Sequence, residues 1–252
     1  MNAKLSTATA KLSITLVLGA GIAGSIFAAL PDDYQEITYI ESTGTQHIMT
    51  DVVPTAATRI VVDFQMTRLH LSTDFSGSAK VAFYSGIQSG NGQLYFGVTS
   101  ADQFQLVYGN KYQNVLATDE QGRDLGPDTE RHVVEIGDGL QKFDGKTVGL
   151  LAYGSYGEKK LKFCLFKANT GSLVNPMWAR VYSFRVYEGE TLAHDYVPCY
   201  RKSDGRAGLY DTAEGVAEGS RFLSNAATGD DFTKGKDVCE PDPEVEPGSY
   251  ER

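Results

Sequence analysis

The chain has 252 residues, of which 41% are hydrophobic and 11% aromatic, and its formal net charge is -9. This length fits one large all-β domain or two small domains, and it is long enough to bury a core without disulfides. An acidic chain without a basic stripe is poorly suited to phosphate backbones, so we expect no nucleic-acid partner.

The first apolar segment contains a glycine pattern that resembles a dinucleotide-binding motif. Ile14 to Leu30 reads ITLVLGAGIAGSIFAAL, in which Gly19, Gly21 and Gly24 have the G-x-G-x-x-G spacing and an acidic residue, Glu41, follows about 20 positions later. A phosphate-binding turn needs an amphipathic helix after it, but the residues up to Leu30 are apolar except for one serine. The pattern therefore disfavours nucleotide binding.

The same segment has the features of an export signal. Lys4 and Lys11 supply a positive start, Leu12 to Phe27 an apolar run, and Ala28 and Ala29 small residues near a cleavage point. We expect residues 1–29 to be a signal peptide and the mature protein to be secreted or displayed on the cell surface. An uncleaved N-terminal anchor is the alternative, and it is the one membrane attachment that the sequence offers.

From residue 59 onward the hydrophobic period is two. In RIVVDFQM (Arg59 to Met66) every second side chain is apolar, which is typical of a half-buried strand. KVAFYSGI, QLYFGV, FQLVYG, RHVVEI, KTVGLLAY, KKLKFCLF and RVYSFRVY follow, separated by Gly, Asn and Asp turns. Short strands at this spacing predict an antiparallel, all-β sandwich or barrel rather than alternating βα units.

The end of the chain and the cysteines add two expectations. Residues 236–252 are acidic and rich in proline, so we expect a disordered tail. Cys164, Cys199 and Cys239 are too few for a disulfide scaffold; a Cys199–Cys239 bridge or three reduced thiols both fit the spacing.

Two segments near the ends of the expected domain resemble a known family. LPDDYQEITYIESTGTQHIMTDV (Leu30 to Val52) and RVYSFRVYEGETLAHDYVPCYRKSDGRAGLYD (Arg180 to Asp211) resemble the opening and closing strands of concanavalin A-like, LamG-type domains of secreted bacterial and phage proteins. RHVVEIGDGLQKFDGKTVG (Arg131 to Gly149) is similar to a hairpin of these domains. The resemblance implies a two-sheet jelly roll spanning residues 30–235.

The resemblance also implies binding more than catalysis. Such domains are mostly modules that bind glycans or proteins, and their β-glucanase relatives carry an E-x-D-x-x-E run, which this chain lacks. Glu188 and Glu190 flank a glycine and suit a solvated hairpin end. We therefore expect no enzymatic activity, although a divergent glycosidase remains an alternative.

Strand parity selects the candidate ligand-binding residues. Leu94, Phe96 and Val98 share one face, which leaves Tyr95 on the other, and the same alternation leaves Tyr84 outside. An aromatic ring on a solvent face can stack on a sugar, although it can equally pack against a neighbouring strand or loop. The candidates for the ligand site are Tyr84, Tyr95, Trp178 and Arg185, with core packing as the competing role of Trp178.

No metal site or cofactor is expected. His47, His70, His132 and His194 lack metal-ligand spacing. Calcium, present in some LamG relatives, could be held by loops near Asp74 or Asn91 to Gly92, but no ligand set is spelled out.

Three functions follow from these expectations. The first is a non-catalytic secreted or surface-attached module that binds carbohydrate in the manner of a lectin. The second is a structural or interaction subunit of an envelope or appendage, whose partner is a surface protein. The third is a divergent glycoside hydrolase.

Overall fold

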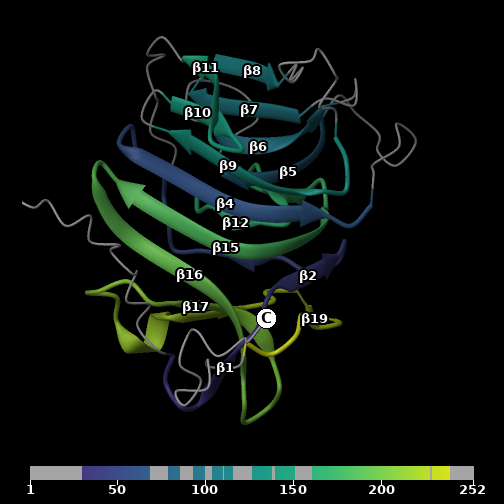
Figure 1. Cartoon of the computed structure of the whole chain (residues 1–252), viewed down its shortest axis with the longest axis vertical. Helices are drawn as coiled ribbons and strands as arrows, with labels where there is room; N and C mark the ends of the chain where they lie inside the picture. Colours follow the sequence, from purple (N-terminus) through teal and green to yellow (C-terminus); the bar gives the residue numbers. More distant parts are fainter. Residues whose placement is uncertain are drawn as a thin grey trace, which may run out of the picture.

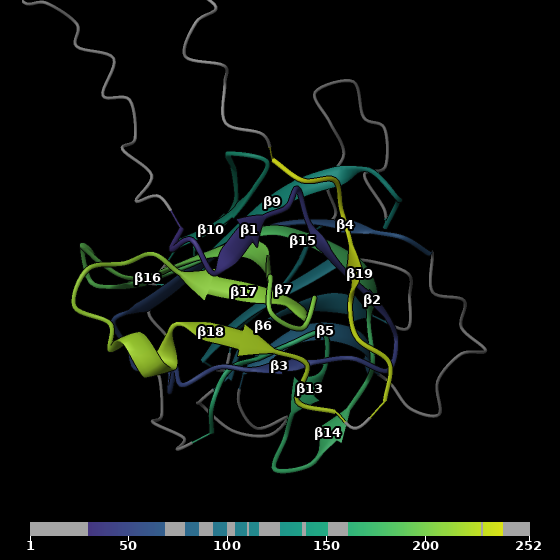
Figure 2. The same cartoon turned by 90° about the horizontal axis from the view of Figure 1, so that it is seen from below.

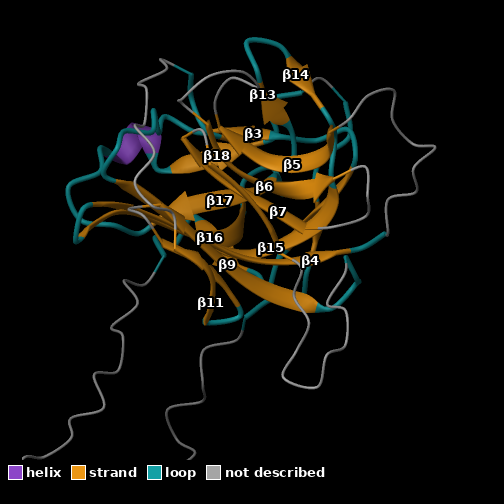
Figure 3. Ribbon diagram, turned by 90° about the horizontal axis from the view of Figure 1, so that it is seen from above, coloured by secondary structure: helices purple, strands orange, loops and turns teal. Residues whose placement is uncertain are grey.

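The computed structural model describes residues 30–68, 79–85, 93–99, 104–109, 111–115, 127–137, 140–150, 161–227 and 229–238. Residues 1–29, expected to be the export signal, lie outside these ranges, as do Cys239 and both candidate calcium loops. Within them the chain is all-β and antiparallel, and the one helical element is a short turn, η1 (Glu218–Ser220), drawn in purple in Figure 3.

The larger sheet is built around β4 (Thr58–Met66) and β15 (Trp178–Glu188), which pair along almost their whole length. Burial alternates strictly along β4, as the sequence period predicts, because one face of the strand packs on the core. Figure 1 shows the strand order from β11 down to β17. The remaining strands of this sheet are β11 (Lys146–Leu150), β10 (Leu140–Phe143), β9 (Arg131–Gly137), β16 (Thr191–Arg201), β17 (Ala207–Asp211), β18 (Phe222–Ser224), β1 (Tyr34–Glu36), β2 (Ile40–Thr43) and β19 (Thr233–Lys234).

The smaller sheet has six strands within the described residues, in the order β3-β12-β5-β6-β7-β8. A separate two-stranded hairpin, β13 (Ala168–Asn169) and β14 (Leu173–Val174), lies at its side in Figure 2. The strands of the sheet are β3 (Ile48–Met49), β12 (Cys164–Leu165), β5 (Ala79–Ser85), β6 (Gln93–Thr99), β7 (Phe104–Gly109) and β8 (Lys111–Val115).

The two sheets share one hydrophobic core. Phe64 of β4 lies 4.9 Å from Phe96 of β6, measured between ring centroids, and Phe96 lies 5.2 Å from Phe104 of β7. All three rings are fully buried, so this aromatic contact joins the sheets face to face. Leu94, Phe96 and Val98 belong to the core, which confirms the parity predicted for that strand.

The opposite face of the smaller sheet is also covered. Tyr95 is only 6% exposed and packs with Val107 and Ala168 in a second apolar cluster. The expectation that Tyr95 faces solvent is therefore wrong, because β13 supplies Ala168 over this face. Its hydroxyl donates a hydrogen bond to Gln105 within the same sheet.

Both ends of the described chain meet at one edge of the larger sheet. Ile37 forms a β-bridge with Asp237, and the backbone N–H of Val238 donates to the carbonyl of Glu36 at 2.9 Å. The β-structure thus continues three residues beyond Gly235, where the sequence places the end of the domain.

The two described cysteines are reduced. Cys164 and Cys199 are fully buried and form no disulfide. Burial raises the pKa of each thiol to about 12, so neither is a reactive thiolate. None of the described helical structure is long and apolar enough to cross a bilayer.

Candidate functional site

A cavity of about 420 Å³ opens beside the β16–β17 hairpin, which places Tyr196 directly opposite Asp211. β16 supplies two of its polar side chains, the end of β17 a third, and the loop that leads into η1 covers one side. Its polar side chains come from Asp51, His194, Tyr196, Asp211, Glu214 and Ser220.

An aspartate holds the imidazole at the centre of this cavity. Nδ1 of His194 lies 2.6 Å from Oδ2 of Asp211, whose side chain is only 1% exposed. The other carboxylate oxygen accepts backbone N–H groups from Asp195 at 3.0 Å and Ala213 at 3.1 Å. A carboxylate only accepts hydrogen bonds, so Nδ1 carries the proton, and in the neutral ring Nε2 presents a lone pair.

The orientation of the imidazole leaves two hydrogen-bonding groups for a ligand. Nε2 of His194 has no hydrogen-bond partner in the described part of the chain, and this side chain is 26% exposed. The Tyr196 hydroxyl lies 3.3 Å from Nδ1, but Nδ1 already donates to Asp211 and cannot accept the phenol proton.

Tyr196 keeps that proton under ordinary conditions. Burial raises the pKa of Tyr196, and the negative charges of Asp211 and Asp51 raise it further. The residue is 2% exposed, and its ring stacks on His194 at 5.4 Å and on Phe184 at 5.5 Å. The phenol is therefore a fixed donor at the wall of the cavity, and among the described residues its one polar neighbour is Nδ1 of His194, which cannot accept the proton.

The charges of the cavity are unbalanced. Asp51, Asp211 and Glu214 line it, whereas none of its lining residues within the described ranges is a lysine or an arginine. At the rim, Nζ of Lys162 lies 2.6 Å from Oδ1 of Asp51, and both side chains are more than half exposed. The carboxylates of the lining thus supply three negative charges, against one positive charge on the nearby Lys162.

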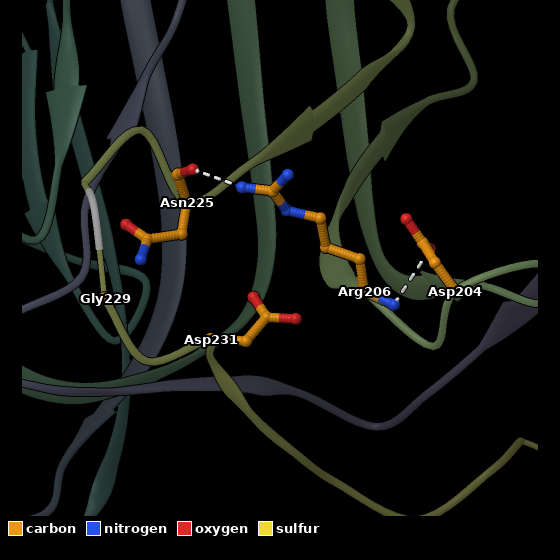
Figure 4. A pocket seen from close by; sticks show the side chains of 5 residues that line it. All are labelled: Asp204, Arg206, Asn225, Gly229 and Asp231. Carbon is orange, nitrogen blue, oxygen red and sulfur yellow. Dashed lines mark hydrogen bonds between the residues drawn. The ribbon is translucent and has the colours of Figure 1, made fainter.

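A second cavity, of about 380 Å³, differs because its polar groups already bind one another (Figure 4). Arg206 donates to the carbonyl of Asn225 at 3.0 Å, and Asp231 accepts the backbone N–H of Ala207 at 2.9 Å. The Arg201 guanidinium and the Arg206 backbone N–H lower the pKa of Asp204 to about 2. This cluster ties the 225–231 loop to the start of β17, so we read it as structural.

The outer face of the larger sheet is likewise occupied by internal pairs. The guanidinium groups of Arg59 and Arg131 each lie 3.9 Å from the ring centroid of a tyrosine, Tyr187 and Tyr182 respectively. Arg131 also forms a two-point ion pair with Asp63, with both distances 2.7 Å. One face of each ring is thus covered, which leaves less aromatic surface for a sugar.

The four candidate ligand residues do not form one site. The backbones of Tyr84 and Tyr95 pair across β5 and β6, but Tyr95 is buried and the side chain of Tyr84 lies outside the described structure. Trp178 and Arg185 lie near opposite ends of β15.

Each of the two β15 candidates has local partners. Trp178 is half-buried beneath Arg68, whose guanidinium lies 4.7 Å from the ring centroid. Arg185 is 40% exposed and lies 3.4 Å from the carboxylate of Asp195. Their proposed contact with a ligand stays a prediction.

The other histidine that invites a functional reading, His132, is a structural residue. It is 8% exposed, and its two ring nitrogens lie 2.7 Å from Asp144 and 2.8 Å from Asp128. Burial lowers its pKa, but the hydrogen bonds that the ring donates to both carboxylates outweigh burial, and the net shift is upward. Among the described residues, no three His, Cys, Asp or Glu side chains are arranged to hold a metal ion.

Sequence reasoning missed the pairing of His194 with Asp211. Metal-ligand spacing of histidines says nothing about a ring held by one carboxylate. The available signal was the hairpin: a turn at KSDGR folds HDYVPCYR back onto AGLYD and brings Tyr196 opposite Asp211.

Comparisons with known proteins provide little beyond this geometry. No protein-family model matches the chain, and no curated protein matches it in sequence. Among solved structures, Trypanosoma rangeli sialidase aligns with a TM-score of 0.33 and 12% identity, over 52% of this chain and 20% of that chain. The aligned region is thus a fifth of the length of that protein.

Proposed function

We propose that the protein is a non-catalytic carbohydrate-binding module, exported to the cell surface or beyond and built on a concanavalin A-like jelly roll. The observation that carries this proposal is the cavity beside β16 and β17, with its held imidazole and its buried phenol. A sugar hydroxyl is both donor and acceptor, so it can donate to Nε2 of His194 and accept from the Tyr196 hydroxyl. A sugar ring carries several hydroxyls, so it can satisfy an acceptor and a donor of the cavity at the same time.

The state of the carboxylates favours binding over glycoside hydrolysis. Hydrolysis needs two carboxyl groups facing the glycosidic bond, one as acid and the other as nucleophile or base. Asp211 is committed to His194 and to two backbone N–H groups, and Asp51 pairs with Lys162. Glu214 alone is left without a described hydrogen-bond partner, so the cavity lacks a free pair.

A glycan array probed with the purified protein, followed by calorimetry on the best ligand, tests the proposal. Tyr196→Phe removes the cavity hydroxyl and keeps the stacked ring, and His194→Gln removes the Nε2 lone pair. We expect each variant to weaken binding roughly three- to tenfold, the effect of one lost hydrogen bond. Tyr182→Phe is the matched control, since its hydroxyl donates to Gln65 on the outer sheet face at 2.7 Å.

The Tyr182→Phe control shows whether a loss of binding is specific to the cavity or follows from removing any tyrosine hydroxyl. Tyr182→Phe should bind like the parent. If no glycan binds, the proposal fails and the structural-subunit function gains ground. Turnover of a bound polysaccharide would instead support the glycosidase.

A further inference from the structure

We propose that the sugar bound in the β16–β17 cavity is an amino sugar with a free, positively charged amine, such as the glucosamine units of a deacetylated polysaccharide. This inference rests on the proposed function and specifies its ligand. It is carried by two features of the cavity, its excess of negative charge and the buried hydroxyl of Tyr196, whose proton finds no acceptor among the described residues.

The first feature calls for a cation. Asp51, Asp211 and Glu214 line the cavity, and Lys162 at the rim offsets one of these charges. Arg221 is also nearby, but its guanidinium donates to the backbone carbonyls of Asp211 and Ala213 and binds Glu218 outside the cavity. An ammonium group therefore reduces the excess of negative charge, whereas a carboxylated sugar would add repulsion.

The second feature excludes a bare cation as the whole ligand. Tyr196 is 2% exposed, and its hydroxyl needs an acceptor, which neither a metal ion nor a simple ammonium group can offer. A ligand that satisfies both features must carry a positive charge and an acceptor oxygen within one ring. An amino sugar has the two groups on neighbouring carbons.

The field of the carboxylates reaches the position of the donor. The charges of Asp211 and Asp51 both act on the Tyr196 phenol in the direction that keeps it protonated. Tyr196 and Asp211 lie opposite each other in the β16–β17 hairpin and line the same cavity, so a sugar unit in that cavity faces both the donor and the carboxylates.

Calorimetry with oligosaccharides of one length tests the inference. The probes are a glucosamine oligomer, its fully N-acetylated counterpart and spermine, all in one neutral buffer in which the sugar amines are partly protonated. We expect the glucosamine oligomer to bind about fivefold or more tightly than the acetylated form, the scale of one ion pair near a protein surface. High salt should reduce this preference because it screens exposed charges.

Matched variants decide whether the cavity carries the preference. Glu214→Gln should remove most of the preference for the glucosamine oligomer, whereas Glu190→Gln, at an exposed hairpin turn outside the cavity, should leave that preference unchanged. Equal binding of both oligomers would overturn the amino-sugar inference and leave the carbohydrate proposal standing. Spermine binding as tightly as the sugar, or equal effects of the two variants, would overturn the inference as well. Failure of every glycan to bind would remove both proposals.

Discussion

Asp211, at the end of β17, fixes the ring of His194 on β16 through a hydrogen bond of 2.6 Å, while its second oxygen accepts two backbone N–H groups. One buried carboxylate thus organises the strand end, the imidazole and the loop that follows. The residue serves the fold as much as the cavity, and substitutions at the two partners should have different consequences.

Asp211→Ala should lower the free energy of unfolding by about 3 kcal/mol, because it leaves two backbone donors and the imidazole without their buried acceptor. His194→Gln should cost less than about 1 kcal/mol, since that side chain is partly exposed and the amide can still donate to Asp211. Urea unfolding followed by circular dichroism measures both values. Equal losses at the two positions would contradict the assignment of the structural role to Asp211.

Tyr95→Ala should destabilise the protein nearly as much as Phe96→Ala, although the two side chains point to opposite faces of β6. Both are buried, so each truncation should cost about 3 to 5 kcal/mol. Tyr95→Phe, which removes only the hydroxyl bonded to Gln105, should cost about 1 kcal/mol. Thermal and urea unfolding measure these losses. If Tyr95→Ala loses no more unfolding free energy than Tyr95→Phe, the side chain is exposed and the burial described above is wrong.

The two faces of β6 show how far the sequence could lead. Alternation of Leu94, Tyr95 and Phe96 indicates which side chains share a face, because neighbouring side chains of a strand point to opposite sides. It cannot indicate what covers a face: Ala168, which packs on Tyr95, is 73 residues away in the sequence and belongs to a separate hairpin. The predicted alternation of side chains along β6 is confirmed, but the predicted solvent exposure of Tyr95 is wrong.

The candidate site illustrates a similar limit. His194 and Asp211 are 17 residues apart, and only the register of the β16–β17 hairpin brings them into contact. Composition and motif spacing report neighbours along the chain, whereas this pair is made across strands. Side-chain pairs of this kind become visible once a turn and its register are known.

His132 should make stability depend on pH. Burial lowers the pKa of this ring, but its hydrogen bonds with Asp144 and Asp128 raise it more, so the folded-state pKa lies above the ordinary value near 6.5. The stabilisation is therefore fully present below the unfolded-state pKa and is lost as pH rises through the folded-state pKa. His132→Gln should cost about 1 to 3 kcal/mol at mildly acidic pH and flatten this dependence, as measured by urea unfolding across the range. If the parent protein grows more stable as pH rises from neutral, His132 is not a protonated ring held by two hydrogen bonds.

Gly44→Ala should be strongly destabilising because two constraints act at once. The backbone φ of Gly44 is +96°, a conformation that side chains with a Cβ rarely adopt, and a Cβ there would lie 2.5 Å from the ring of Trp178. We expect a loss of about 2 to 4 kcal/mol and a change in tryptophan fluorescence, since Trp178 is the only tryptophan in the chain. Gly145→Ala is the control: its φ is +75° but a Cβ would meet nothing within 4 Å, so it should cost about 1 kcal/mol. Equal losses at both glycines would mean that the tryptophan contact contributes nothing.

Truncations that end the chain at Val238 and at Gly235 should differ, although only three residues separate them. Residues 236–238 extend the edge of the larger sheet: the carbonyl of Lys236 accepts the N–H of Thr38 at 2.8 Å, and the N–H of Val238 donates to Glu36 at 2.9 Å. The segment after Val238 is acidic and offers few apolar side chains for burial, so its removal should leave the melting temperature essentially unchanged. Loss of residues 236–238 exposes the paired edge of β1 and should lower the melting temperature by roughly 4 to 8 °C, which corresponds to about 2 kcal/mol for a domain of this size. Differential scanning calorimetry on the two truncations measures this difference, and equal melting temperatures would place the end of the domain at Gly235, where the sequence alone puts it.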